Sequence, residues 1–369
     1  MLGKFFAYVK RRKAIVNDFK VNTKYLCDGT YVFNDTINYI TRNDVYTKRR
    51  TYQLFQNNYY VNGFNKFFAL LLKKTFFRKE FTISERGNQL GGFSGTVYLP
   101  VRSTNSYSDK KIFDFTNNQV LTIFSKEKDY RLFLNHYETF KNYFSMPEIL
   151  WNDDKQLLII EELIINQPNN SWEKEDFLYV MINLYDHYIH YFKAAKTKGI
   201  NHLIKPNELL SSLPKGYDTC FIRNKINSEL LEFKYPSIKL HGDLWTANIL
   251  LVKNEESDIY LIDWEWSNQL IFFYDLFLMM WHEVIKHSNY IYIEKYAKGE
   301  YDSYFKEMFG IFEIEFQAQF RLDYLNIFFI NLFTEKTKYS NEKSRIQEFQ
   351  QYKKFIQQIK TWSFLAPSL

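Results

Sequence analysis

Two short polar clusters, each set in an apolar run, constrain this chain more than any other feature. The first cluster lies in residues 240–250, which read LHGDLWTANIL, and the second in residues 260–265, which read YLIDWE. Their apolar flanks are typical of β-strands, and the acidic segment 254–258 predicts a hairpin turn between them. Asp243 and Asp263 lie 20 residues apart. The alternative is two aspartates in ordinary turns, but this spacing with these flanks is not expected by chance.

The polar residues of the two clusters are the types that phosphoryl transfer requires. That reaction needs an oriented hydroxyl group, an acceptor for its proton, and divalent cations that neutralise the phosphate oxygens. We predict that Asp243 accepts the proton, and that Asn248 and Asp263 hold Mg²⁺ through hard oxygen atoms. His241 is predicted to brace the loop by hydrogen bonding. The co-substrate would be ATP or GTP.

The same residues resemble a known superfamily. The run His-Gly-Asp-Leu-Trp-x-x-Asn-Ile-Leu, followed by Leu-Ile-Asp-Trp-Glu, is similar to the aminoglycoside phosphotransferases and choline kinases, which are small-molecule relatives of the protein kinases. Asp275, in the run Tyr-Asp-Leu, matches a further family feature, an aspartate with a structural role. The resemblance covers roughly residues 86–335, of which about 35 are specific. It implies an α+β, two-lobed protein-kinase-like fold with a small β-rich N-lobe and a large, mainly helical C-lobe.

The chain divides into three parts under this interpretation. We expect a basic N-terminal extension at residues 1–85, a nucleotide-binding N-lobe at 86–164, and a catalytic and acceptor-binding helical C-lobe at 165–369. Short β-type runs with turns between them, and one helical stretch, indicate the middle part. The last part opens on a helix that Asn170 and Glu173 are predicted to cap and that Gly199 ends.

The glycine-rich run at residues 91–98, GGFSGTVY, is the candidate for a phosphate-covering loop. Backbone amides could approach phosphates there without bulky side chains intruding, so Gly92, Ser94 and Gly95 are predicted cofactor-binding residues. The alternative is a simple glycine-rich turn. Glu162 and Leu163 are predicted to lie in the segment between the lobes, whose backbone would meet the adenine.

The resemblance also implies a lysine on the next strand, paired with a glutamate on the following helix. Thr122 occupies the position that aligns with this lysine, which is a departure from the family pattern. Lys111, on the preceding strand, is the best replacement, and Lys126 and Lys128 are further candidates. Glu138 is the expected glutamate partner. If no lysine takes this place, the chain binds nucleotide poorly.

Charge is unevenly distributed along the 369 residues, whose net charge is +6. Residues 1–90 carry 17 Lys and Arg against 6 Asp and Glu, whereas residues 275–335 carry 5 against 10. The basic residues 1–85 could attract an anionic glycan, a lipid headgroup or a membrane surface. No recognised nucleic-acid reader motif accompanies the charge, so no nucleic-acid partner is expected.

The remaining features favour a cytoplasmic protein, with peripheral contact at the inner membrane face as the alternative. No apolar run approaches the ~20 residues of a membrane-spanning helix, and no secretory signal is recognised. The two cysteines, Cys27 and Cys220, form neither a disulfide framework nor a metal-ligand spacing, which fits a reducing compartment.

The leading hypothesis is a kinase of a small hydroxylated molecule. Sugar-like or polyol acceptors, including glycan precursors, rank ahead of amino-alcohols and aminoglycosides. Aromatic residues make up 20% of the chain, so the run Phe272, Phe273, Tyr274 and Trp281 predicts core packing rather than a cage for a cationic acceptor. The alternative is a catalytically impaired, nucleotide-binding pseudokinase or scaffold, which Thr122 motivates. A nucleic-acid-binding protein ranks third.

Overall fold

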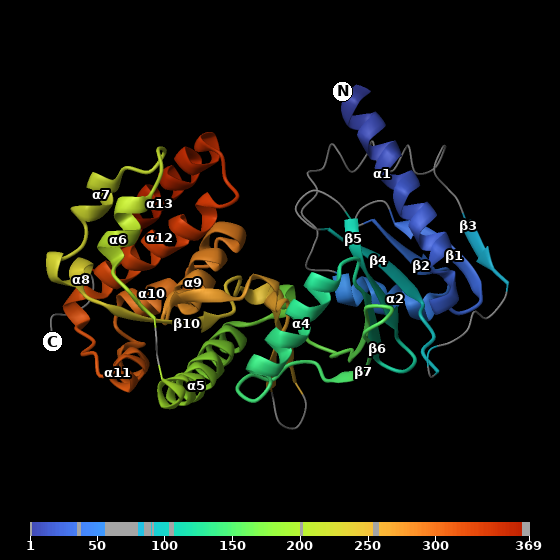
Figure 1. Cartoon of the computed structure of the whole chain (residues 1–369), viewed down its shortest axis with the longest axis horizontal. Helices are drawn as coiled ribbons and strands as arrows, with labels where there is room; N and C mark the ends of the chain where they lie inside the picture. Colours follow the sequence, from blue (N-terminus) through green and yellow to red (C-terminus); the bar gives the residue numbers. More distant parts are fainter. Residues whose placement is uncertain are drawn as a thin grey trace. The chain divides into compact units, whose positions relative to one another are not determined.

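The computed structural model describes residues 2–34, 38–55, 80–84, 90, 92–102, 107–199, 202–253 and 258–363. The chain divides into two compact units, which are described separately (Figure 1). The first comprises residues 1–135, 146–171 and 250–260, and the second comprises residues 136–145, 172–249 and 261–369. One unit is rich in strands and the other is mainly helical, which confirms the predicted α+β fold class.

The first unit is built on an eight-stranded antiparallel sheet. The strand order is β3-β1-β2-β4-β5-β6-β8-β7, so most neighbours in the sheet are also neighbours along the chain, as hairpin connections require. The strands are β1 (Gly29–Asn34), β2 (Tyr39–Arg42), β3 (Glu80–Ile83), β4 (Val97–Arg102), β5 (Tyr107–Asp114), β6 (Gln119–Ile123), β7 (Ile149–Asp153) and β8 (Leu158–Glu162).

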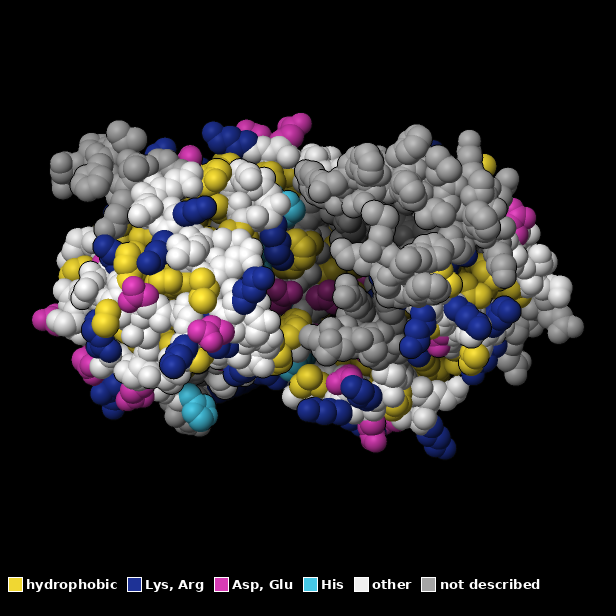
Figure 2. All heavy atoms as spheres, turned by 90° about the horizontal axis from the view of Figure 1, so that it is seen from above, with side chains coloured by type: hydrophobic (Ala, Val, Ile, Leu, Met, Phe, Trp, Pro, Cys, Tyr) yellow, Lys and Arg dark blue, Asp and Glu magenta, His cyan; other side chains and the backbone are white. Residues whose placement is uncertain are grey.

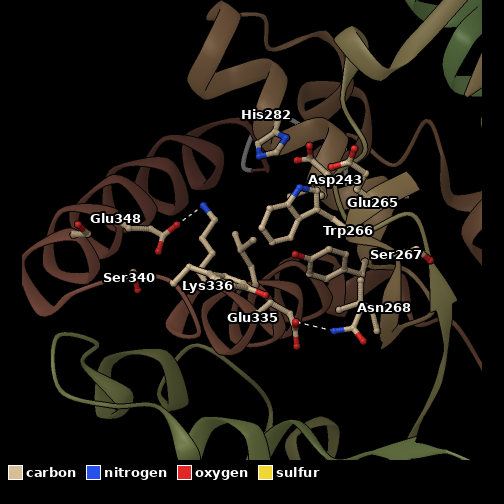
Figure 3. A pocket seen from close by; sticks show the side chains of 17 residues that line it. Asp243, Glu265, Trp266, Ser267, Asn268, His282, Glu335, Lys336, Ser340 and Glu348 are labelled. Carbon is tan, nitrogen blue, oxygen red and sulfur yellow. Dashed lines mark hydrogen bonds and ion pairs between the residues drawn. The ribbon is translucent and has the colours of Figure 1, made fainter. Parts of the chain in front are cut away.

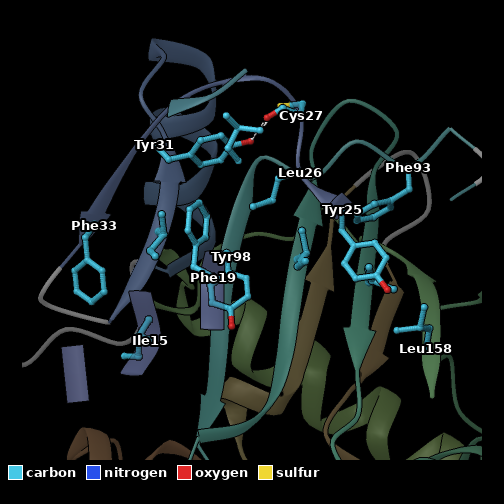
Figure 4. Packing of buried hydrophobic residues seen from close by; sticks show 14 of the residues in the cluster. Ile15, Phe19, Tyr25, Leu26, Cys27, Tyr31, Phe33, Phe93, Tyr98 and Leu158 are labelled. Carbon is cyan, nitrogen blue, oxygen red and sulfur yellow. Dashed lines mark hydrogen bonds between the residues drawn. The ribbon is translucent and has the colours of Figure 1, made fainter. Parts of the chain in front are cut away.

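Helix α1 (Leu2–Val21) packs on one face of this sheet. The ring of Phe19 lies 5.6 Å from the ring of Tyr31 on β1 and 5.6 Å from that of Tyr98 on β4. Figure 4 shows these rings together with Ile15, one turn earlier in the helix. Full burial of such a side chain contributes about 1.5–3 kcal/mol, so α1 is anchored to the sheet by its apolar face.

Two further helices pack against this sheet. Phe55, the last residue of α2 (Val45–Phe55), contacts Tyr39 on β2 and Phe113 on β5, with ring centroids 5.2 and 5.6 Å away. Successive side chains of a strand point to opposite faces of a sheet. Phe113 packs with α2 and the preceding Ile112 packs with α1, so the two helices lie on opposite faces. Helix α4 (Glu127–Phe140) packs against the sheet through Tyr130. Its residues divide between the two units.

The predicted boundary at residue 85 needs correction. Residues 29–34, 39–42 and 80–83 form three strands of the same sheet as the predicted N-lobe, with β2 hydrogen-bonded to β4. They belong to one compact unit because apolar side chains of β1 and β2 are buried in its core. The described part of the N-terminal segment is therefore an integral part of the first unit and not an extension.

Some of the basic charge in this segment packs inside the unit. Arg12 is 7% exposed and its guanidinium lies 4.7 Å from the Phe33 ring, while that of Arg50 lies 5.6 Å from the Phe115 ring. On the face shown in Figure 2, the Lys and Arg side chains of the described residues are interspersed with Asp and Glu. The charge count alone therefore overstates the basic surface that residues 1–85 could offer to an anionic partner.

The second unit is mainly helical. Its helices are α5 (Lys174–Lys198), α6 (Pro206–Ser212), α7 (Thr219–Arg223), α8 (Ser228–Glu232), α9 (Tyr274–His287), α10 (Ile291–Ala297), α11 (Asp302–Ile311), α12 (Arg321–Thr337) and α13 (Glu342–Ser363). A small sheet has the order β13-β10-β9, formed by Asn268–Ile271, Tyr235–Leu240 and Leu203–Ile204. Strands β11 (Ile249–Val252) and β12 (Asp258–Leu261), whose residues 250–260 belong to the first unit, form the predicted hairpin, and its turn residues 254–257 lie outside the described part.

Aromatic residues form the core of this unit. Phe272, Phe273, Tyr274 and Trp281 are each at most 3% exposed, which confirms core packing over a cation cage. The Phe273 ring, for example, stacks on Phe309 with centroids 5.7 Å apart. Every residue of α9 from Tyr274 to Val284 is buried. This helix is therefore fixed from all sides and can position the residues that it carries.

Helix α5 begins and ends close to the predicted residues. Gly199 follows its last residue with a φ of +88°, a backbone conformation that glycine adopts readily, so the predicted end is confirmed. The predicted N-cap is wrong by three residues: Glu173 caps the helix, and Asp176 accepts a hydrogen bond from the Glu173 amide at 3.0 Å. Across the described residues, no helix has the length and hydropathy needed to cross a membrane.

Candidate active site

The loop that follows strand β10 is held by a buried aspartate at the start of α9. Asp275 accepts hydrogen bonds from the backbone amides of His241 and Gly242 at 2.7 and 2.9 Å, and from the Tyr188 hydroxyl at 2.7 Å. Burial raises the pKa of Asp275, and these donors and the nearby His241 oppose that shift. The position in the first helical turn also favours a negative charge. Asp275 thus fixes the loop from outside it.

Gly242 allows this loop to turn sharply. Its φ is +81°, and a Cβ atom at this position would lie 2.3 Å from the backbone oxygen of Trp266. A side chain is therefore excluded both by the backbone conformation and by the close approach of the neighbouring segment. The second residue of the His-Gly-Asp run is glycine for this reason.

His241 connects the two polar clusters. Its ring is fully buried, and its Nε2 lies 2.8 Å from the Ile262 carbonyl, which fixes Nε2 as the donor. Nδ1 then accepts a hydrogen bond from the Asp243 amide at 3.3 Å. The ring also lies 4.6 Å from the Trp264 ring. His241 therefore braces the loop, and no free ring nitrogen is left for proton transfer.

Asp243 and Asn248 lie together in the loop, which closes through the short 3-10 helix η4 (Thr246–Asn248). The Asn248 amide nitrogen donates to the Asp243 carbonyl at 2.8 Å and lies 3.4 Å from Asp243 Oδ2. Burial raises the pKa of Asp243, the nearby Lys286 and His241 lower it, and Asp263 raises it. The effect of Asp263 on Asp243 indicates that the folded hairpin brings the Asp263 carboxylate near the loop.

Asp263 adopts a backbone conformation that is rare for an aspartate. Its φ of +64° and ψ of 52° place it in the left-handed region, just before the short helix η5 (Trp264–Trp266). Such a conformation costs about 1–3 kcal/mol and is retained where the surroundings impose it. Here the preceding Ile262 amide donates to the Asn248 carbonyl at 3.0 Å. The exposed Asp263 side chain is thus held next to the Asn248 segment.

These oxygen atoms fit a divalent cation. Because the Asn248 amide nitrogen is used inside the loop, its Oδ1 remains for a cation, and Asp263 supplies a carboxylate. Mg²⁺ prefers hard oxygen ligands, typically one or two from the protein, with the others from phosphates and water. The donor set on the protein is therefore of the right chemistry for a magnesium–nucleotide complex.

Two functional candidates on α9 were not predicted. Glu283 is 1% exposed and accepts a hydrogen bond from the Thr246 hydroxyl at 2.5 Å. The Lys286 ammonium lies 3.1 Å from the centre of the Trp245 ring. Lys286 is exposed as a residue, but burial of its ammonium lowers its pKa to about 8, which the nearby Asp243 opposes.

Helical spacing could have found both residues. Glu283 and Lys286 lie 8 and 11 residues after Asp275, which are about two and three helical turns. All three side chains therefore lie on one face of α9, and each interacts with the loop of residues 241–248. In the described part of the chain no ion pair of Lys286 is found, so its charge is not neutralised by direct contact.

A cavity of about 530 Å³ adjoins Asp243 (Figure 3). At its other side, Glu335 accepts from the Asn268 amide nitrogen at 2.9 Å, and Lys336 pairs with Glu348. The cavity has the volume of a small-molecule site, and its lining mixes apolar and polar side chains. It lies within the second unit and includes residues of α9, α12 and α13.

Three side chains determine the polarity and the aromatic surface of this cavity. His282 is 7% exposed and its Nδ1 has no hydrogen-bond partner, while burial keeps its pKa well below the usual value and its ring neutral. Trp266 and Tyr339 are 45% and 69% exposed, with ring centroids 5.2 Å apart. A neutral polar group inside and exposed aromatic faces nearby suit a polar molecule with apolar C–H faces.

The predicted phosphate-covering loop at residues 92–95 needs correction. The Ser94 amide donates to the buried Asp114 carboxylate at 2.7 Å, and the Gly95 amide donates to the Tyr25 carbonyl at 3.1 Å. A Cβ at Gly95 would lie 2.3 Å from Ile112, so this glycine serves core packing. At Gly92, by contrast, nothing lies within 4 Å of an added Cβ. The Ser94 and Gly95 amides are already used, and the Asp114 carboxylate would repel phosphate.

The predicted lysine replacement lies beside the expected position. Lys111 on β5 is directly opposite Thr122 on β6, so both side chains lie on the same face of the sheet. The Thr122 hydroxyl is buried without a partner. Lys126 and Lys128 are exposed, before and at the start of α4. Lys111 therefore remains the candidate that the sheet register favours.

The other residues predicted to contact the nucleotide form interactions within the protein. Glu138 forms an ion pair with Lys141 at 2.8 Å, one turn along, and its side chain is 63% exposed. The Leu163 amide donates to the Asn118 carbonyl at 2.8 Å, and the Leu163 side chain is buried in the core of the first unit. The Glu162 amide likewise donates to Glu148. The amides of Glu162 and Leu163 are therefore not available to an adenine.

Comparisons with known proteins add similarities at low identity. No family model matches the chain, and no curated protein matches it. Among solved structures, the choline kinase LicA from Streptococcus pneumoniae is 12% identical, with a TM-score of 0.41, over 79% of this chain and 98% of that one. An aminoglycoside-3'-phosphotransferase of type VIII is 12% identical, with a TM-score of 0.38, over 65% and 95%.

A choline/ethanolamine kinase family protein from Mesorhizobium loti is 13% identical, with a TM-score of 0.36, over 69% of this chain and 84% of that one. These similar structures come from the same groups that the two polar clusters resemble. Because the three TM-scores are below 0.5, the function proposed below rests on the residues of this chain and not on these similarities.

Proposed function

We propose that this chain transfers the terminal phosphoryl group of ATP or GTP to a hydroxyl group of a small molecule bound in the cavity beside Asp243. The observation that carries the proposal is the arrangement of Asp243, Asn248 and Asp263 in one braced loop system next to that cavity. Phosphoryl transfer requires a proton acceptor and cation ligands close to a site for the acceptor molecule, and positioning contributes most of the catalysis.

The reaction would proceed as an in-line displacement. The acceptor oxygen forms a bond to the terminal phosphorus while the bond from that phosphorus to its bridging oxygen breaks, and the nucleoside diphosphate leaves. The acceptor proton passes to the Asp243 carboxylate, whose raised pKa makes it a better base. Asn248 Oδ1 and the Asp263 carboxylate would hold Mg²⁺, which neutralises charge on the phosphate oxygens.

Lys286 supports this arrangement as a positive charge beside the base. It lowers the pKa of Asp243 and so keeps the carboxylate ionised before it accepts the proton. The Trp245 ring under its ammonium limits the positions that the side chain can take. We assign Lys286 a positioning role, which the mutation described in the Discussion tests.

For the acceptor we propose a sugar-like or polyol molecule, including glycan precursors, ahead of amino-alcohols and aminoglycosides. Glu335 and Glu348, two of the cavity carboxylates, are already paired with lysines, which weakens the case for a cationic acceptor. The neutral His282 leaves its Nδ1 for a hydroxyl group. The exposed Trp266 and Tyr339 rings offer apolar faces to a sugar ring.

A catalytically impaired nucleotide-binding protein is the second candidate. Thr122 at the expected lysine position and the occupied amides of Ser94 and Gly95 favour it, since both weaken the nucleotide side of the site. Isothermal titration calorimetry with ATP and Mg²⁺, then with GTP, separates the two candidates. Nucleotide binding without transfer to any acceptor would favour the impaired protein.

The test of the proposed kinase is a transfer screen with ATP or GTP as donor. The panel holds sugars, polyols, amino-alcohols and aminoglycosides, and the product is detected by mass as an added phosphate. We expect phosphorylation of at least one sugar or polyol. Phosphorylation of cationic acceptors alone would overturn the acceptor ranking, and failure to bind either nucleotide would overturn the kinase.

A further inference from the structure

A second cavity lies in the second unit and has no part in the proposed reaction. Its volume is about 340 Å³, and its lining includes Tyr143, Lys198, His202, Ser237, Lys239 and Gln269. None of the described residues that line it is acidic. A cavity lined by two lysines and a histidine, without a carboxylate, has the chemistry of an anion site.

The strands β10 and β13 separate this cavity from the acceptor cavity. Lys239 on β10 pairs with Gln269 on β13, so their side chains lie on the same face, together with Ser237 two residues earlier. Asn268 and Leu270, which line the acceptor cavity, alternate with Gln269 and lie on the other face. β10 also leads directly into the loop that carries Asp243, so the two cavities share one structural element.

Lys239 is a half-buried cation without a counter-ion. No ion pair of Lys239 is found among the described residues, and burial alone lowers its pKa. Burial lowers the pKa of the nearby His136, and the charge of Lys239 lowers it further. The Lys239 ammonium lies 5.9 Å from the centre of the Phe140 ring and forms no ion pair with a described carboxylate, so an anion in the cavity would offset the cost of its partial burial.

Ser237 points to the same conclusion independently. It is 4% exposed, and its hydroxyl has no hydrogen-bond partner. Leaving a buried hydroxyl unsatisfied is unfavourable, so a group that accepts a hydrogen bond from it would be bound favourably. The Lys198 ammonium, which lies 3.1 Å from the Tyr143 hydroxyl, is a further donor at the edge of the cavity.

We propose that this cavity binds the phosphate group of a small phosphorylated molecule, with Lys239 and Ser237 as its buried donors and Lys198 at its rim. A phosphate monoester carries nearly two negative charges and three acceptor oxygens, which match two lysines and a hydroxyl. The cavity is larger than one phosphate ion, so the ester is favoured over inorganic phosphate. This inference does not depend on the proposed transfer reaction.

The test compares two probes, inorganic phosphate and glycerol 3-phosphate, by calorimetry and thermal unfolding at constant ionic strength, with sodium chloride as the blank. The full chain binds the ester more tightly than inorganic phosphate if the proposal holds. Lys239→Gln weakens ester binding about tenfold or more, because it removes a charge-assisted contact. Ser237→Ala weakens it severalfold. Lys306→Gln, at an exposed lysine of α11, leaves binding unchanged.

The stability of these variants without the probe distinguishes loss of the site from loss of folding. Without the probe, Ser237→Ala should be at least as stable as the wild type, because it removes a hydroxyl that has no partner. A variant that is stable on its own but gains less from the ester supports the site. Equal ester affinity in Lys239→Gln and the wild type, or no saturable binding of the ester, would overturn the proposal.

Discussion

The loop of residues 241–248 and the glycine-rich segment of residues 92–95 carry similar sequence signals, but their polar groups serve different ends. In the loop, Asp275 and Glu283 from α9 bind two backbone amides and the Thr246 hydroxyl, which leaves the Asp243 carboxylate to line the cavity. In the segment, Asp114 binds the Ser94 amide itself. In both regions a buried aspartate from elsewhere in the chain accepts hydrogen bonds from backbone amides, but of the two only the loop also carries a carboxylate, that of Asp243, at a cavity.

This difference separates a functional turn from a structural one. A loop can bind a ligand only if other parts of the protein satisfy its backbone and leave some of its polar groups free. The glycine content of the two regions does not show this, because Gly242 and Gly92 both have positive φ values. The side chains that remain decide it, because the loop keeps the Asp243 carboxylate at the cavity, whereas residues 92–95 carry no charged side chain.

Apart from Asp243, the largest expected effect comes from Asp263. The variant Asp263→Asn removes a carboxylate that we propose as a cation ligand, so kcat should fall about a thousandfold while the fold persists. Raising the Mg²⁺ concentration should recover part of the activity. The matched control is Asp186→Asn, at an exposed aspartate of α5. Equal activity of the Asp263 variant and the wild type would remove Asp263 from the site.

The two glycines give a direct contrast. An alanine at Gly242 would place Cβ 2.3 Å from the Trp266 backbone oxygen, so we expect about a hundredfold loss of activity and a loss of about 2–3 kcal/mol in stability. Gly92→Ala meets no atom within 4 Å, and its φ of +93° should cost about 1 kcal/mol without changing kcat. If both variants lose activity equally, the glycine-rich segment does take part in catalysis.

A variant of Asp114 tests whether the glycine-rich segment has a structural role. Its carboxylate is fully buried and accepts from the amides of Ser94, Thr116 and Asn117 at 2.7, 2.9 and 3.1 Å. Replacement by alanine leaves these amides unsatisfied, so the free energy of unfolding should fall by about 2–3 kcal/mol. Denaturant unfolding measures this loss, and kcat per folded molecule should not change. A stable variant without nucleotide binding would reverse the interpretation.

The smallest expected effect comes from Lys286. The variant Lys286→Met should lower kcat about tenfold and change KM little, because a positive charge beside the base is lost. In the wild type, kcat should fall as the pH rises through about 8, where Lys286 loses its proton next to Asp243, Glu283 and Lys336. Lys286→Arg should keep its activity above that pH. Lys306→Met is the control, and an unchanged pH profile in Lys286→Met would exclude the assigned role.

Sequence spacing anticipated the proximity of three residues in the second unit better than it anticipated the contacts of the glycine-rich segment. Asp243, Asn248 and Asp263 lie in one hairpin, so local spacing was enough to bring them together. The partners that use the glycine-rich segment come from far along the chain: Asp114 lies 20 residues after Ser94, and Tyr25 lies 70 residues before Gly95. A single sequence does not reveal such distant pairings.

The same reason explains the error at residue 85. Strand β2 joins the sheet by pairing with β4, more than 50 residues later, and β1 joins by pairing with β2; the pairing with β4 leaves no local signal. The N-terminal charge clusters were prominent, but Arg12 and Arg50 pack on aromatic rings of the unit. Lys286 was within reach of prediction, since helical spacing from Asp275 places it on the face that meets the loop.

The most direct test of the central claim is phosphoryl transfer by the variant Asp243→Asn. Purified wild type and variant are compared with the acceptor found in the transfer screen, and nucleotide binding and thermal unfolding are measured in parallel. Asp243 is proposed as the proton acceptor, so transfer should fall at least about a thousandfold, with nucleotide affinity and unfolding temperature nearly unchanged. Transfer by Asp243→Asn at the wild-type rate would contradict the account.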